Sequence, residues 1–105
     1  MNAVQADIQN LIKVELNEAN KVNPQFNSAH EGYAVILEES DEVNMEVVTM
    51  SDCLTELWRS VKANNNGKST INVCLLRAAA VNLACEAVQV AAMCDKLLAF
   101  YAQGG

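Results

Sequence analysis

The sequence of residues 71–102 is INVCLLRAAAVNLACEAVQVAAMCDKLLAFYA, and it contains neither glycine nor proline, the residues that most often end a helix. Its apolar residues recur at three- and four-residue intervals, which places a stripe of them along one helical face. This stripe consists of Leu75, Ala79, Leu83, Val90, Met93 and Leu97. We therefore expect one long helix over 71–102, capped by Ser69 or Thr70.

The chain before this helix predicts two further helical regions. The first covers about residues 3–22, because apolar side chains recur there with helical spacing and Pro24 then disfavours helical geometry in the residue before it. The second starts near Ala29, since Ser28 and Glu31 have the spacing of a capping box.

The second region contains two expected interruptions. Residues 47–49 are β-branched and residues 51–52 offer a fresh cap, so we expect a kink or break near 49–52. The run NNNG at 64–67 is the clearest loop in the chain, because asparagine and glycine tolerate left-handed conformations.

The composition favours an all-α fold. Apolar residues make up 51% of the 105 residues and aromatic residues 5%, and there are one proline and four glycines. This composition suits helices better than a turn-rich β fold, and the length is that of one domain. We expect a single domain over 1–105, a helical bundle of about three to four helices per chain. Because so few helices leave apolar surface uncovered, we expect it to assemble as an oligomer.

Charge and hydropathy argue against two classes of partner. The net charge of -6 repels a phosphate backbone, so we expect no nucleic acid partner. Polar residues interrupt the apolar runs of residues 1–20, unlike those of a signal peptide. Residues 71–102 are also interrupted, and lack the roughly 20 consecutive apolar residues of a membrane span. We expect a cytoplasmic protein that does not bind a membrane.

The four cysteines do not have the pattern of a zinc site. They are Cys53, Cys74, Cys85 and Cys94, without CxxC spacing, and His30 is the only histidine. We interpret them as small free thiols in a reducing compartment.

The strongest charge pattern is an acidic stretch in the second helical region. No lysine or arginine lies between Lys21 and Arg59, whereas eight of the thirteen acidic residues do. Five of these share an arc of roughly 100° on a helical wheel: Glu31, Glu38, Glu39, Glu42 and Glu46. A solvated helix face would account for the arc, but like charges four residues apart destabilise a helix. Since Mg²⁺ prefers a few carboxylate oxygens, the pattern favours a magnesium site.

Glu86 lies near the centre of the apolar stripe of residues 71–102. A carboxylate there must be protonated, paired or bound to a metal, because burying the ionised group alone is very unfavourable. Gln89 lies at the edge of the same stripe. The alternative to a metal is a buried salt bridge from Glu86 to Arg59 or Lys62.

Two stretches together resemble a known family. Residues 30–42, HEGYAVILEESDE, resemble the start of the metal-binding helix in MazG-like all-α NTP pyrophosphohydrolases. Residues 86–93, EAVQVAAM, resemble the second metal helix of phage and mobile-element members. The family pattern is an ExxE pair followed downstream by ExxD. Glu39 and Glu42 match the pair and Glu86 matches the third position, whereas Gln89 stands where the family has aspartate.

The resemblance implies Mg²⁺-dependent hydrolysis of a nucleoside triphosphate, NTP or dNTP, to the monophosphate and pyrophosphate, of the nucleotide-pool house-cleaning type. Because each chain has only about three helices, we also expect a homodimer or homotetramer. The metal ligands would be Glu39, Glu42, Glu86 and Gln89, with Glu38 or Glu39 as the base that activates water. Lys62 and Trp58 are candidates for binding the substrate, although Lys62 fits a surface charge and Trp58 a core position equally well. The alternative is a non-catalytic helical oligomer or partner-binding module with an acidic face.

Overall fold

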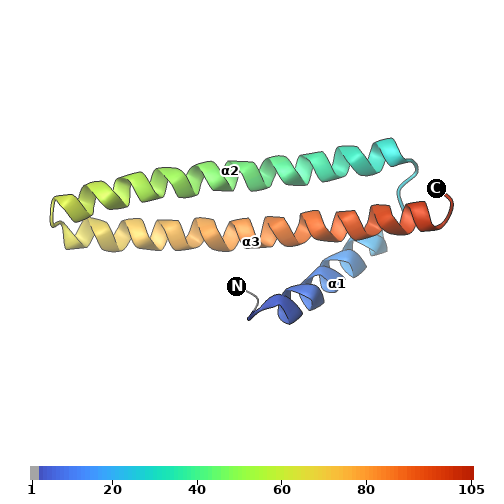
Figure 1. Cartoon of the computed structure of the whole chain (residues 1–105), viewed down its shortest axis with the longest axis horizontal. Coiled ribbons are helices and arrows are strands. Elements are labelled where there is room, and N and C mark those ends of the chain that lie inside the picture. Colours follow the sequence, from blue (N-terminus) through green and yellow to red (C-terminus); the bar gives the residue numbers. More distant parts are fainter. Residues whose placement is uncertain (1–2) are drawn as a thin grey trace. The chain divides into compact units, whose positions relative to one another are not determined.

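The computed structural model of the chain describes residues 3–105 and has three α-helices in this range. Figure 1 labels them α1 (Gln5–Val22), α2 (Ala29–Lys62) and α3 (Asn66–Ala102). No strand occurs between residues 3 and 105. The expected all-α fold is therefore confirmed, with three helices per chain.

Contacts between residues group the chain into two compact units. The first unit contains the chain up to Ser40 together with Glu86–Gly105, so it consists of α1, the start of α2 and the end of α3. The second unit is Asp41–Cys85, a helical hairpin made from the rest of α2 and the start of α3. The single domain expected from the sequence stays a prediction.

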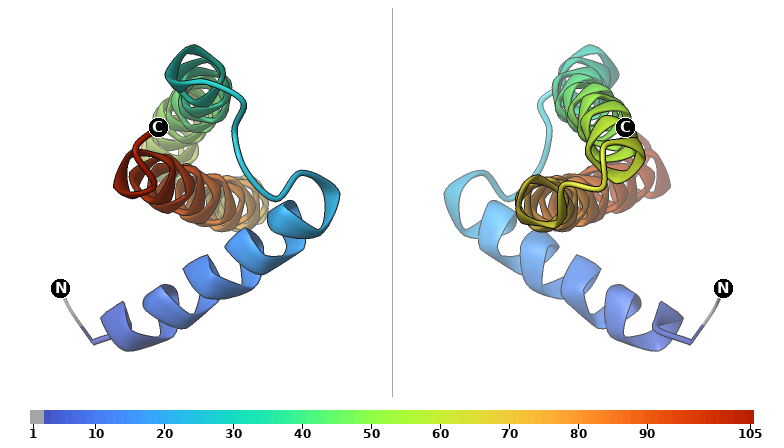
Figure 2. Two further views of the ribbon diagram at one scale, coloured as in Figure 1. Left: turned by 90° about the vertical axis from the view of Figure 1, so that its right-hand side faces the viewer. Right: turned by 90° about the vertical axis from the view of Figure 1, so that its left-hand side faces the viewer.

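Helix α1 ends where the sequence predicts, before Pro24. The residue at its C-cap, Asn23, has an extended backbone with φ −133. Its carbonyl oxygen accepts a hydrogen bond of 2.6 Å from Lys96 Nζ on α3. The Lys96 side chain is only 5% exposed, and its ammonium lies 4.9 Å from the centroid of the Phe26 ring. Lys96 thus holds the end of α1 and the following segment, which Figure 2 shows, against α3 within the first unit.

Helix α2 begins at Ala29 with the predicted cap. The backbone N–H of Glu31 donates to Ser28 Oγ at 3.1 Å, which satisfies one of the free donors of the first turn. The Glu31 carboxylate turns back and accepts from the backbone N–H and the side-chain amide of Asn27, at 3.2 and 3.1 Å. Glu31 therefore caps the helix and is held at its first turn.

Gly32 allows two parts of the first unit to approach closely. A Cβ at this position would lie 2.7 Å from Leu97 Cδ1 on α3 and 3.0 Å from Cδ2 of Phe26. Phe26 is 6% exposed, so its ring is packed on most sides. The start of α2 can reach this distance from α3 because residue 32 has no side chain.

The break that the sequence predicts near 49–52 is wrong, since α2 continues to Lys62. The hydroxyl of Thr49 donates to the Met45 carbonyl at 3.2 Å, and that of Thr55 to the Ser51 carbonyl at 3.1 Å. These bonds satisfy the hydroxyls inside the helix. The β-branched residues lower helix propensity by less than about 1 kcal/mol each, which packing easily overrides.

Helix α2 ends in a tight turn at residues 63–65. Asn64 has the left-handed conformation expected of this run, with φ 53. The Asn65 N–H donates to the Ser60 carbonyl at 2.9 Å and the Asn64 N–H to the Val61 carbonyl at 3.0 Å. This pair of bonds is the Schellman arrangement that closes a helix C-terminus.

The expected cap of α3 at Ser69 or Thr70 is wrong, because the helix starts at Asn66. Asn65 is the cap, since its Oδ1 accepts a hydrogen bond of 3.1 Å from the Lys68 backbone N–H. One short turn therefore ends α2 and starts α3, and Gly67 belongs to the first turn of the helix.

A buried hydroxyl joins the two helices of the second unit near this turn. Ser60 is 5% exposed, and its Oγ donates to the Leu57 carbonyl at 2.8 Å. The same oxygen accepts from Ser69 Oγ at 2.9 Å and from Asn72 Nδ2 at 3.3 Å. These bonds hold the end of α2 against the start of α3, because each polar group would otherwise lose a partner.

Helix α3 is long and apolar enough to cross a membrane, judged by length and composition alone. One 18-residue window has a mean hydropathy of 1.5. The core helix of a soluble protein can pass the same test, so this is weak evidence. The cytoplasmic location and the absence of a membrane partner stay predictions.

Candidate metal centre

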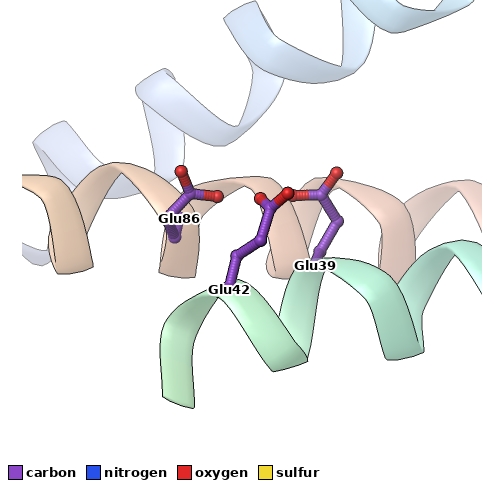
Figure 3. Close-up of side chains that lie close together, drawn as sticks. All are labelled: Glu39, Glu42 and Glu86. Carbon is purple, nitrogen blue, oxygen red and sulfur yellow. The ribbon is translucent and has the colours of Figure 1, made fainter. Parts of the chain in front are cut away.

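Glu39 on α2 and Glu86 on α3 lie together in the first unit, and both are half-buried. Each offers a carboxylate oxygen within 4.8 Å of the other, and Glu42 offers a third oxygen within the same distance. Figure 3 shows the three carboxyl groups, two from α2 and one from α3. The unit boundary falls after Ser40, but α2 is continuous there. Its helical spacing therefore holds Glu42 one turn from Glu39.

The other acidic residues of the predicted arc lie outside this group of carboxylates. Glu38 is exposed and lies outside the group of oxygens described above, since one residue along a helix turns the side chain by about 100°. Glu31 caps the start of α2. Glu46 is half-buried in the second unit. Of the two candidates for a base, Glu39 is the one within the group of carboxylates.

The side-chain amide of Gln89 completes the polar cluster of the first unit. With its nitrogen turned toward the acids, it donates to Glu39 Oε2 at 2.8 Å and to Glu86 Oε2 at 3.1 Å. With its oxygen turned toward them, three acceptors would face one another, which is favourable only around a cation. Hydrogen bonding decides which way such an amide points. Gln89 therefore has one orientation suited to a cluster without metal and another suited to a cation.

The spacing of the carboxylates fits a small divalent ion. Oxygens bound to one octahedral Mg²⁺ are about 3.0 Å apart when adjacent and about 4.2 Å apart when opposite, since each Mg–O bond is about 2.1 Å. The three oxygens, each within 4.8 Å of the others, would move closer together on binding one ion. At these distances like charges repel by up to a few kcal/mol per pair, less where solvent screens them. A cation at this position would convert that repulsion into attraction.

The two predicted substrate-binding residues lie in the second unit. Lys62 Nζ is 5.4 Å from the centroid of the Trp58 ring, a cation–π contact. Trp58 is 59% exposed, so the alternative of a core position for its ring is wrong for the single chain. Along α2 it follows Glu39 by about five turns. Their role in binding substrate stays a prediction.

The alternative partners for Glu86 have other contacts. Arg59, in the second unit, forms an exposed ion pair of 2.6 Å with Glu56 one turn earlier, and Lys62 lies over Trp58. Glu86 instead lies beside Gln89 and Glu39. The structure thus brings three of the four predicted metal ligands together and places the fourth in hydrogen-bonding contact with two of them.

One residue of the first unit, Lys96, is not among those predicted from the sequence. Lys96 is a buried cation on α3, seven residues after Gln89 and therefore on nearly the same helical face. Its position in an apolar stretch was the available signal, since a lysine is almost never fully buried without a partner. Sequence alone gives no means of naming that partner, the Asn23 carbonyl, which is 73 residues away.

No protein-family model, curated protein or solved structure matches this chain. The resemblance to MazG-like proteins therefore stays a prediction based on the two motif stretches. The candidate site rests on the geometry of Glu39, Glu42, Glu86 and Gln89 in this chain.

Proposed function

We propose that the chain is a Mg²⁺-dependent nucleoside triphosphate pyrophosphohydrolase of the MazG-like type, which converts an NTP or dNTP to the monophosphate and pyrophosphate. The observation that carries this proposal is the group of carboxylate oxygens from Glu39, Glu42 and Glu86 within 4.8 Å of one another. Three carboxylates this close together, from two separate stretches of sequence, repel one another, and a bound cation would offset that repulsion.

Each residue of the cluster has a role in this proposal. Glu39, Glu42 and Glu86 hold the metal, and Gln89 adds either an amide oxygen as a ligand or a hydrogen bond that orients two of the ligands. The bound Mg²⁺ would neutralise phosphate charge and lower the pKa of a water molecule. Glu39 is the better candidate for the base, because Glu38 lies outside the group. A homodimer or homotetramer remains part of the proposal.

A second function has its own supporting observation. The Gln89 amide can donate to both Glu39 and Glu86, which satisfies these acids in part without any cation. On this basis the chain would be a non-catalytic helical oligomer or a partner-binding module, whose acidic cluster fixes the packing of α2 on α3. This alternative predicts no effect of Mg²⁺ on stability.

The test is a panel of NTPs and dNTPs assayed with Mg²⁺, in which released pyrophosphate and released phosphate are measured separately. We expect pyrophosphate from at least one nucleotide. The Glu42→Ala and Glu86→Ala substitutions should each lower kcat/KM by more than about 100-fold, since even residues that only support metal ligands can cost that much. Melting temperatures with and without Mg²⁺ should be recorded for the same proteins.

The matched control is Asp41→Ala. Asp41 is exposed, precedes Glu42 directly and lies outside the group of carboxylates, so its removal takes away the same charge without touching the cluster. We expect its kcat/KM to stay within a few-fold of the unsubstituted chain. Absence of metal-dependent turnover with every nucleotide, together with a melting temperature that does not respond to Mg²⁺, would leave the non-catalytic function.

A further inference from the structure

The side-chain amide of Gln89 contacts both acids of the first unit's cluster. Its nitrogen carries two N–H donors. When this nitrogen is turned toward the acids, it donates to Glu39 Oε2 at 2.8 Å and to Glu86 Oε2 at 3.1 Å. Both lengths are ordinary for N–H···O bonds, and the charge of the acceptors strengthens them. One neutral side chain can therefore satisfy one oxygen of each acid.

These two bonds have different places in the fold. Glu86 precedes Gln89 by three residues on α3, so the bond between them lies within one helix. Glu39 belongs to α2, so the other bond joins two helices of the first unit. Figure 3 shows these two acids on their separate helices. In this donor orientation, the amide fixes both carboxylates and ties α2 to α3.

The reverse orientation of the amide gives up both bonds. Rotation of the terminal amide by half a turn exchanges its nitrogen and its oxygen. The oxygen then faces the two carboxylates, and such a group of acceptors is favourable only when a cation lies among them. Because one end of the amide faces the acids at a time, the donor orientation and the cation-binding orientation exclude each other.

Neither orientation isolates the other end of the amide from water. Gln89 is half-buried. Between residues 3 and 105, the one fully buried side-chain nitrogen or oxygen without a hydrogen-bond partner is Oδ1 of Asn20. The end of the Gln89 amide that points away from the acids can therefore bond to water. Rotation of the amide costs only the bonds to Glu39 and Glu86.

A carboxylate at residue 89 would behave differently from this amide. An ionised carboxylate binds a cation but has no hydrogen to donate, so it would add a fourth negative charge to the repulsion among Glu39, Glu42 and Glu86. The amide relieves that repulsion when no cation is bound, and its oxygen is a suitable ligand when one is. Glutamine thus combines a donor and a ligand in one neutral group.

We propose that Gln89 is a reversible latch on the metal centre, an inference that rests on the proposed Mg²⁺-dependent function. In the metal-free protein, the amide donates to Glu39 and Glu86 and holds α2 against α3. On binding of Mg²⁺ the amide rotates and directs its oxygen at the cation. Gln89 therefore sets the affinity for Mg²⁺, because two charge-assisted hydrogen bonds are given up whenever the cation binds.

The first experiment compares the melting temperatures of the unsubstituted chain and Gln89→Glu, each in EDTA and in saturating Mg²⁺. This substitution keeps the length of the side chain and removes both donors. In EDTA we expect Gln89→Glu to melt at a lower temperature, because four carboxylates then repel one another. Its Mg²⁺ affinity should rise at least about tenfold, so it should gain more from the cation.

The matched control is Gln103→Glu. Gln103 is exposed and lies fourteen residues after Gln89, so the same change of charge is made away from the cluster. We expect its melting temperature in EDTA and its response to Mg²⁺ to match those of the unsubstituted chain. Equal melting temperatures of Gln89→Glu and the unsubstituted chain in EDTA would overturn the proposal, because no donor bonds would have been lost.

The second experiment observes the amide in the unsubstituted chain, so it does not depend on the folding of a variant. Nuclear magnetic resonance measures how fast the side-chain amide protons of Gln89 exchange with water. We expect exchange at least about tenfold faster in Mg²⁺ than in EDTA, because both hydrogen bonds to the acids are lost. The side-chain amide of Gln103 is the internal control and should exchange at the same rate in both conditions.

The two readouts separate failure of the latch from failure of the proposed function. A melting temperature that rises with Mg²⁺ while the Gln89 protons keep their exchange rate would overturn the latch, since the amide would still donate beside the bound cation. The proposed function would then stand. A melting temperature that does not respond to Mg²⁺ would also overturn the latch. Together with no pyrophosphate release from any nucleotide, it would overturn the proposed function as well.

Discussion

The two units of this chain differ in the polar groups that they bury. In the first unit, α1, α2 and α3 place polar groups where they are partly or fully buried, namely the Lys96 ammonium and the cluster of Glu39, Glu86 and Gln89. In the second unit, the one buried polar side chain is the uncharged Ser60, and both units expose large apolar side chains. The groups suited to chemistry therefore lie mainly in the first unit.

The difference follows from the number of helices that pack together. Three segments surround the interior of the first unit, so a charged side chain there can be buried and given a partner, as Lys96 is by Asn23 and Phe26. Two helices surround only one seam in the second unit, so most side chains remain at the surface. Changes to buried polar groups should therefore have their largest effects in the first unit.

The largest stability effect is expected for Lys96→Met. Methionine keeps the apolar stem but removes the charged hydrogen bond to Asn23 and the contact with the Phe26 ring. Together these should cost about 2 kcal/mol of the free energy of unfolding. Urea denaturation at fixed protein concentration measures the loss. Lys13→Met, at an exposed site on α1, is the control and should change stability by less than about 0.5 kcal/mol; equal effects of both substitutions would contradict this role of Lys96.

The next largest effect is a change in Mg²⁺ affinity on substitution of Gln89. Gln89→Asp supplies a fourth carboxylate and removes the amide that can donate to Glu39 and Glu86. We expect at least tenfold tighter Mg²⁺ binding, about 1.4 kcal/mol, measured by calorimetry or by the rise in melting temperature with Mg²⁺. Asn66→Asp, exposed at the start of α3 and twenty residues before Glu86, adds the same charge and should leave Mg²⁺ affinity unchanged. Weaker Mg²⁺ binding by Gln89→Asp would indicate that the amide acts as a hydrogen-bond donor in a cluster without metal.

The smallest predicted effects come from one glycine substitution in each unit, which should change the free energy of unfolding in opposite directions. Gly32→Ala should lower the free energy of unfolding by about 1 kcal/mol, because the new methyl group would lie 2.7 Å from Leu97 and 3.0 Å from Phe26. Gly67→Ala should raise it by up to about 1 kcal/mol, since a Cβ there meets only Asn65 Oδ1 at 3.7 Å and alanine favours the helix. Chemical denaturation of both variants tests the comparison, and a loss of stability from both would refute it.

Local sequence signals predicted much of the helical framework. Pro24 fixed the end of α1, and Ser28 fixed the start of α2 as its cap. Asn64 took the left-handed conformation expected from the asparagine run. These features depend on a few neighbouring residues, so a local reading of the chain can find them.

The errors arose where a local preference was weak. Residues 47–52 suggested a break, but the hydroxyl of Thr49 donates to the Met45 carbonyl within α2 and the helix continues. Asn65, Ser69 and Thr70 could each cap α3. Asn65 is the cap, because the Schellman turn at the end of α2 places it directly before the helix. In both places several residues had similar propensities, and local hydrogen bonds and turn geometry accompany the outcome.

The sequence by itself determined that this chain is helical, that its acidic residues concentrate on the second helix, and that Glu86 is out of place on an apolar stripe. Each of these depends on spacing and composition within one helix. Only the tertiary structure decided that Glu39, Glu42 and Glu86 meet while Glu38 does not, that Gln89 can donate to two of these acids, and that Lys96 reaches the end of α1. Those contacts join residues far apart in the chain, and their positions depend on how the helices pack against one another.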